Sequence, residues 1–281
     1  LYLQGKLAAL PGWVNFLEPA RAGRQLHTTL VRNEHAYHCC VAQLLPHLAW
    51  GAKAGAPAAP PPHDELVAVV GDSHCLAPGW QTIRESPAGG SGAGAGGGRT
   101  LLLRPVLVTG VKCWHLRPEG RFYPKVQWAA AMEALPRHSR AVVVVGEIDC
   151  REALLLCVER ARYETVDEGA AVAAGHLVRA LVDAARRRSL GTVWVHAVPP
   201  VLNETRRVVR LFNRVLEREV RKAGAPLVWL EGIEAAMLTD ATATDAGLRP
   251  DLVLDGTHMH PKCAGLIEEA IALSAAPTRS G

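Results

Sequence analysis

The sequence predicts an α/β protein, a three-layer α/β/α sandwich around a central sheet of five parallel strands. Three observations support this fold class. Short apolar runs alternate with longer segments of helical character over most of the 281 residues. Runs such as 141–145 are continuously apolar, which suits strands buried on both faces. Glycine and polar residues follow several runs directly, where the carboxyl ends of parallel strands meet and ligands bind.

The strands are expected where the apolar runs are shortest and most continuous. They fall at 66–70, 104–109, 141–146, 191–197 and 226–230. The segments between them mostly have helical character, and helical crossovers join parallel strands. The run at 66–70 ends directly in Gly71-Asp72-Ser73, so a serine is expected at the tip of a strand.

Four longer segments are expected to form helices. They fall at 151–162, 166–187, 203–223 and 261–274. Asn203 opens the third of them and can cap its first turn. Arg186, Arg187 and Arg188 stand at the end of the second, where positive charge complements the helix dipole.

The chain is expected to contain one main domain with an appendage. Residues 1–50 read as a helical appendage that could contact a protein partner, and 51–63 as a Gly/Ala/Pro linker. Residues 64–281 then form the main domain. The glycine-rich run at 88–98 has no strand before it and no helix after it. It is therefore interpreted as a flexible surface insertion rather than a dinucleotide loop.

Composition argues against several functional classes. The net charge of +4 is modest and no basic patch is interleaved with aromatic residues, so nucleic acid is not an expected partner. No apolar run approaches the length of a membrane span. The seven cysteines show no CxxC pair and no zinc spacing, so no metal site is expected. Buried free thiols in a reducing compartment are favoured, and with them a soluble intracellular protein.

Two short motifs carry the candidate chemistry. Ser73 stands where an α/β protein exposes a nucleophile, and Asp255-Gly256-Thr257-His258 supplies an acid and a histidine three residues apart. A serine hydroxyl needs such a base before it can attack a carbonyl. The alternative for Ser73 is an ordinary helix cap, and for the downstream motif an ordinary turn.

These residues resemble the SGNH (GDSL) hydrolase superfamily. The resemblance covers about residues 64–275 and also includes Gly110, Gly146-Glu147-Ile148-Asp149, the run from His196 to Pro200, and Phe212-Asn213. It implies the flavodoxin-like strand order 2-1-3-4-5. It also implies that Ser73 is the nucleophile, that His258 is the base oriented by Asp255, and that Gly110 contributes to the oxyanion hole.

One position departs from the family pattern. The asparagine that donates to the oxyanion in the family corresponds to Ile148, which has no side-chain donor. Losing one such donor typically costs about 10²–10³ in rate. Either Arg151 or a backbone N–H replaces it, or catalysis has been lost. Asp149 and Arg151 follow a buried strand and are expected to face the pocket, with a structural ion pair of Glu147 and Arg151 as the alternative.

The catalytic histidine has a competitor in His260, which Pro261 follows directly as in many family members. The three-residue step from Asp255 favours His258. By the resemblance, the leading hypothesis is a serine ester hydrolase that acts on acyl esters of carbohydrates, lipids or small molecules and needs no cofactor. The alternatives are an O-acyltransferase and a binding or scaffold protein of the same fold without turnover.

Overall fold

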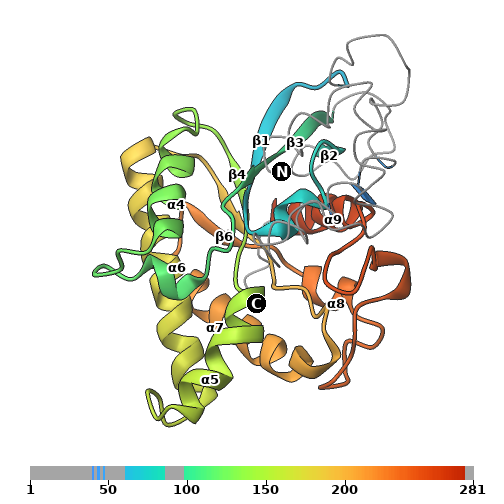
Figure 1. The fold of residues 1–281 in the computed structure, drawn as a ribbon. Coiled ribbons are helices and arrows are strands. Elements are labelled where there is room, and N and C mark those ends of the chain that lie inside the picture. Colours follow the sequence, from blue (N-terminus) through green and yellow to red (C-terminus); the bar gives the residue numbers. More distant parts are fainter. Residues whose placement is uncertain (1–39, 41–42, 45–46, 48–60, 86–97, 276–281) are drawn as a thin grey trace, which may run out of the picture.

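The computed structural model describes residues 61–85 and 98–275, together with Cys40, Gln43, Leu44 and His47. The expected appendage over 1–50, apart from those four residues, lies outside the described residues. So do the linker up to residue 60 and the glycine-rich run from 88 to 97. The described chain forms a curled six-stranded sheet with helices on both faces (Figure 1).

Five of the six strands are parallel and follow the expected order. The sheet order is β2-β3-β1-β4-β5-β6. The strands are β1 (Glu65–Gly71), β2 (Thr82–Glu85), β3 (Arg99–Leu107), β4 (Ala141–Val144), β5 (Val193–Val195) and β6 (Leu227–Trp229). Without β2, the remaining order is the 2-1-3-4-5 arrangement that the family resemblance implies.

The expectation of a purely parallel five-stranded sheet was wrong at one edge. β2 pairs antiparallel with β3, from Thr82 opposite Leu102 to Glu85 opposite Arg99. The partner strand correspondingly begins at Arg99 rather than at residue 104. β2 has only four residues and a single buried side chain, Ile83. An edge strand this short carries no strand periodicity that sequence can reveal.

The helices form the two outer layers. They are α4 (Tyr123–Glu133), α5 (Leu154–Glu159), α6 (Val166–Arg188), α7 (Arg206–Ala223), α8 (Ile233–Met237) and α9 (Cys263–Ala275). α4, α6 and α7 lie side by side on one face, and α9 covers the other near β2 (Figure 1). α4 and α8 were not expected. A π-helical turn, η5 (Asp149–Ala153), precedes α5, where continuous helix was expected from residue 151. In the described part of the chain no helix is long and apolar enough to cross a bilayer.

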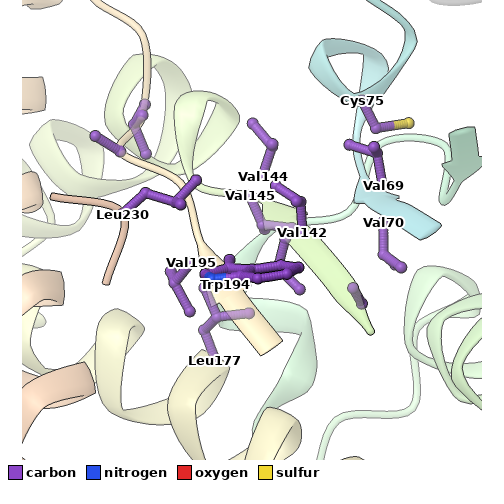
Figure 2. Packing of buried hydrophobic residues seen from close by; sticks show 14 of the residues in the cluster. Val69, Val70, Cys75, Val142, Val144, Val145, Leu177, Trp194, Val195 and Leu230 are labelled. Atoms are coloured by element: carbon purple, nitrogen blue, oxygen red, sulfur yellow. The ribbon is translucent and has the colours of Figure 1, made fainter. Parts of the chain in front are cut away.

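The core lies between the sheet and these helices. Figure 2 shows Val142 and Val144 of β4 beside Trp194 and Val195 of β5, with Leu177 of α6 packed below them. All five side chains are at most 4% exposed. Each such side chain stabilises the fold by about 1.5–3 kcal/mol. The rigid sheet that results fixes the positions of the loops after its strands.

The parallel strands end at a common edge. Gly71 at the end of β1 pairs with Leu107 of β3 on one side and Val144 of β4 on the other. A Cβ on Gly71 would lie 2.0 Å from the Val144 carbonyl oxygen, so only glycine fits here. The segments after β1, β3 and β4 therefore leave the sheet close together.

Candidate functional site

Ser73 begins a short 3₁₀ turn directly after β1. The turn is η3 (Ser73–Leu76), and Asp72 caps it by accepting a hydrogen bond from the backbone N–H of His74 at 3.0 Å. Ser73 is half-buried, whereas its neighbours Asp72 and His74 are buried. The Ser73 hydroxyl makes no hydrogen bond to another described residue. Ser73 is thus more accessible than the two residues beside it, which are buried.

Asp255 and His258 form a hydrogen-bonded pair in the loop before α9. Asp255 Oδ2 lies 2.9 Å from His258 Nδ1, and Oδ1 accepts the backbone N–H groups of Thr257 and His258 at 2.6 and 2.7 Å. Burial alone would raise the pKa of Asp255, but these donors outweigh it, so the pKa lies below its ordinary value. The carboxylate thus orients the ring and leaves His258 Nε2 for another partner.

The Asp255–His258 pair reaches the turn after β1. The ring of His258 packs against the ring of His74, with 5.7 Å between centroids and 46° between the planes. His74 is the residue next to Ser73, so the base predicted from sequence lies against the residue that follows the predicted nucleophile. Hydrogen bonds between catalytic groups often shorten only when substrate binds.

His260 has different neighbours. Its ring packs against His47 at 4.4 Å between centroids, and its Nδ1 accepts the backbone N–H of Lys262. Burial and the charges of His47 and Lys262 lower its pKa. Within the described residues His260 has no carboxylate hydrogen bond comparable to that of His258.

Glu147 and His74 are buried and lie against each other next to the turn that begins at Ser73. Glu147 follows β4, and its Oε2 is 3.9 Å from His74 Nε2 and 3.5 Å from the guanidinium of Arg151. Arg151 also lies 3.7 Å from Glu152. The ion pair between Glu147 and Arg151, weighed as an alternative from sequence, is therefore present. The only sequence signal for His74 was its position next to the serine.

Asp149 is placed differently from the expected pocket wall. It is fully buried, and its two oxygens accept the backbone N–H groups of Cys113 and Trp114 at 2.7 and 3.2 Å. Burial raises its pKa to about 6, although these donors oppose the shift. Asp149 therefore anchors the 3₁₀ turn η4 (Cys113–Leu116), which follows Gly110.

Two glycines near the site have a positive φ angle. Gly110, with a φ of +65°, lies three residues after the end of β3. Val108, the first residue after β3, donates its N–H to the Gly71 carbonyl at 2.7 Å. Gly146 has a φ of +133°, and a Cβ there would lie 2.6 Å from the ring of Phe212. Ile148 is 9% exposed and directly precedes the π-helical turn. In the described part of the chain no group of His, Cys, Asp and Glu side chains could hold a metal ion.

No family model matches the chain, and no curated protein matches it in sequence. Solved structures do match in fold. Among them are three variants of Axe2 from Geobacillus stearothermophilus, two described as an acetyl-xylooligosaccharide esterase and one as an acetylxylan esterase. Their sequence identity is 13–14% and the TM-score is 0.45. The matches cover 77–79% of this chain and 97–100% of those chains. The functional argument therefore rests on the residues of the site.

Proposed function

We propose that the protein is a serine ester hydrolase with Ser73 as nucleophile, His258 as base and Asp255 as orienting acid. One observation carries the proposal. Asp255 Oδ2 and His258 Nδ1 are hydrogen-bonded at 2.9 Å. The centroid of the His258 ring lies 5.7 Å from the centroid of the ring of His74, the residue that follows Ser73. Acyl transfer needs a serine, a base and an acid, and on this proposal all three lie at the carboxyl edge of the parallel sheet.

The reaction proceeds through an acyl-serine intermediate. Ser73 Oγ attacks the ester carbonyl carbon while His258 Nε2 takes its proton, and Asp255 stabilises the imidazolium that forms. The C–O bond to the alcohol then breaks, and His258 returns the proton to the leaving oxygen. Water, deprotonated by His258, attacks the acyl carbon, the bond to Ser73 Oγ breaks, and His258 returns the proton to that oxygen as the acid leaves.

The oxyanion needs donors aimed at one point. On this proposal they are the backbone N–H groups of Ser73 and Gly110, which leave neighbouring strands at the same edge. Asp149 contributes by anchoring the turn after Gly110 rather than by touching substrate. Arg151 is the proposed source of the remaining positive charge. The Arg151 side chain is 30% exposed, and its guanidinium lies 3.5 Å from Glu147 Oε2. Glu147 in turn contacts His74, the residue that follows Ser73.

Acyl esters of small molecules, carbohydrates or lipids are the proposed substrates. A fluorophosphonate probe, which reacts with an activated serine, tests the nucleophile without knowledge of the natural substrate. Wild type should be labelled and should hydrolyse an activated acetyl ester, and Ser73→Ala should do neither while keeping its melting temperature. Ser139→Ala is the matched control, since that hydroxyl is exposed and donates to the Pro136 carbonyl. Labelling that persists in Ser73→Ala would overturn the assignment.

A binding protein without turnover is the second candidate, and Ile148 is the observation that favours it. An isoleucine at this position cannot donate to an oxyanion, and this one is nearly buried. This candidate predicts that wild type shows neither labelling nor hydrolysis, with Ser73 acting only as the first residue of its turn. Labelling of wild type at Ser73 would exclude it.

A further inference from the structure

Three large apolar side chains are exposed together at the start of α4. Phe122, Tyr123 and Val126 are 53%, 50% and 67% exposed, and we call them the α4 patch. The other large apolar side chains that are exposed in the described part of the chain lie elsewhere in the sequence, singly or as one adjacent pair. Grouped apolar exposure marks a binding surface more often than scattered exposure does. The proposed reaction gives this patch no role.

The two exposed rings of the α4 patch continue a row of rings that begins in the preceding loop. The centroid of the His115 ring lies 5.0 Å from that of Phe122, and the centroids of Phe122 and Tyr123 are 4.7 Å apart. Burial, together with the charges of Lys112 and Arg117, lowers the pKa of His115 to about 4, so this ring is uncharged near pH 7. The row is therefore an uncharged aromatic surface.

The loop that presents the α4 patch is held by contacts on both sides. Lys125 Nζ donates to the carbonyl groups of Arg117 and Pro118 at 2.7 and 2.6 Å. The guanidinium of Arg117 lies 4.8 Å from the centroid of the Trp114 ring, and Asp149 accepts the N–H of Trp114. A surface that is already fixed loses less entropy when a ligand binds. The exposed rings are thus preorganised for binding.

The α4 patch lies beside the glycine proposed for the oxyanion hole. A Cβ on Gly110 would lie 3.8 Å from the Tyr123 hydroxyl oxygen, whereas no atom of Phe122 or Val126 would lie within 4 Å of it. α4 is the first α-helix after β3, so its start lies at the same carboxyl edge of the sheet as Ser73. A substrate bound with its ester carbonyl at Gly110 therefore has the patch within reach.

The chemistry of the α4 patch favours an apolar chain over a sugar. Its polar group, the Tyr123 hydroxyl, is at the end next to Gly110, and Phe122 and Val126 offer only carbon atoms. The ammonium group of Lys125 is turned to the loop carbonyls. A sugar needs hydrogen-bond partners for its hydroxyl groups along its length, whereas an alkyl or aryl chain needs only apolar surface. Each CH₂ that leaves water strengthens binding by about fourfold.

We propose that the α4 patch binds the apolar chain of an ester, so that the protein prefers esters with an alkyl or aryl chain over acetylated sugars. The substrate preference rests on the proposed function, whereas binding of an apolar chain to the patch does not. Phe122 and Tyr123 are then specificity-determining residues that contact the substrate away from the reacting atoms.

Binding can be measured without turnover in Ser73→Ala protein labelled with ¹⁵N. Methyl octanoate should shift the backbone amide signals of Gly110, Phe122, Tyr123 and Val126. Methyl acetate, the same ester without the chain, should not shift them at the same concentration, and neither should an acetylated methyl glucoside. No shift with methyl octanoate, or an equal shift with the glucoside, would overturn the proposal.

The substrate preference is read from two pairs of esters. p-Nitrophenyl octanoate against the acetate varies the acid, and octyl acetate against ethyl acetate varies the alcohol. In wild type the longer chain should raise kcat/KM by about tenfold or more in at least one pair, and Phe122→Ala combined with Tyr123→Ala should lower that ratio by about tenfold. Leu273→Ala is the matched control, because this leucine of α9 is 58% exposed on the other face of the sheet. Ratios that the double variant leaves unchanged would overturn the assignment.

The two proposals fail separately. An inactive, unlabelled wild type whose Ser73→Ala variant still binds methyl octanoate at the α4 patch would reject the ester hydrolase and keep the patch. An active wild type without a chain preference in either pair would keep the hydrolase and reject the patch. If the double variant unfolds, Val126→Ser decides, since this side chain is the most exposed of the three and its loss should lower the ratio by about two- to fourfold.

Discussion

Asp149 and Asp255 are two carboxylates at the same edge of the sheet, and each accepts two backbone N–H groups. Asp149 is fully buried and uses both oxygens for this purpose. Asp255 accepts both N–H groups on one oxygen and keeps the other against the ring of His258. Burial raises the pKa of Asp149 to about 6, whereas the His258 ring and the two N–H donors outweigh burial and lower the pKa of Asp255.

The comparison teaches that the partner of a carboxylate, and not its place in a motif, decides what it can do. Asp149 is fully buried with a backbone donor on each oxygen, so its observed role is to hold a turn. An acid with one oxygen on an imidazole can also stabilise a charge that appears during a reaction. Substitutions at and around the two residues should therefore separate loss of activity from loss of stability.

We expect the largest loss of activity from a substitution of His258, the residue that Asp255 holds. His258→Ala removes the base, so hydrolysis of an activated acetyl ester should fall about as far as in Ser73→Ala, by about 10⁶-fold, because triad members act as a unit. His260→Ala should keep most of the activity, since that ring faces His47 and the Lys262 N–H. A reversed ranking of initial rates would assign the base to His260 and remove Asp255 from the site.

Asp255→Asn should come next, with kcat lower by about 10⁴-fold, because an amide at this position favours the wrong tautomer of His258. Its stability should change little, since the Asn side-chain oxygen can still accept the N–H groups of Thr257 and His258. Steady-state rates and a urea titration on the same preparation provide both readings. If Asp255→Asn lost stability but kept its rate, Asp255 would have a structural role like that of Asp149 and no role in catalysis.

Arg151→Met tests whether the turn that contains Asp149 also serves catalysis. Methionine keeps much of the stem and removes the charge, so kcat should fall by about 10²–10³ if Arg151 replaces the absent oxyanion donor. Ile148→Asn should then restore part of the rate. The matched change Arg160→Met, on an exposed residue after α5, should have no such effect. Full activity in Arg151→Met would limit this arginine to its ion pair with Glu147.

Asp149→Asn should give the smallest change in rate and a measurable loss of stability. Asparagine offers only one acceptor oxygen, so one buried N–H of η4 loses its partner at a cost of about 1–3 kcal/mol. Urea denaturation measures this loss. Asp183→Asn, an exposed change in α6, serves as control. A stability equal to wild type would show that Asp149 does not anchor the turn.

The same pair of proteins gives a pH test. The pKa of Asp149 is about 6 in the folded protein against an ordinary 3.8, so between these values the native state keeps a proton that the unfolded chain has lost. Wild type should therefore lose stability relative to Asp149→Asn as the pH rises from about 4 to 6. The free energy of unfolding of Asp149→Asn should therefore fall further below that of wild type at pH 4 than at pH 7. The reverse order would contradict a raised pKa for Asp149.

Sequence predicted the parts of this fold that repeat a pattern. The five parallel strands and the long helices α6 and α7 were expected because continuous apolar runs and helical spacing carry their own signal. β2 and α8 are too short to show a period, and α4, at Tyr123–Glu133, was not among the expected helices.

The site divides in the same way. The three-residue step from Asp255 to His258 is local, so sequence could suggest the contact that the structure contains. His74 lies in the loop after β1, and Glu147 lies in the loop after β4. These two strands are neighbours in the sheet, and their pairing register brings the two side chains into contact. No local pattern encodes that register, so such a pair can be found only in three dimensions.

The unexpected strand β2 also changes how the molecule meets other chains. A strand at the border of a sheet is a template on which any extended peptide can add itself. Here the backbone N–H of Arg84, in the middle of β2, donates to Glu268 of α9 at 2.7 Å. One backbone donor of this strand is therefore already hydrogen-bonded to a side chain of α9. Glu268→Ala should make this border more prone to strand-by-strand aggregation, which a fluorescent amyloid dye would report.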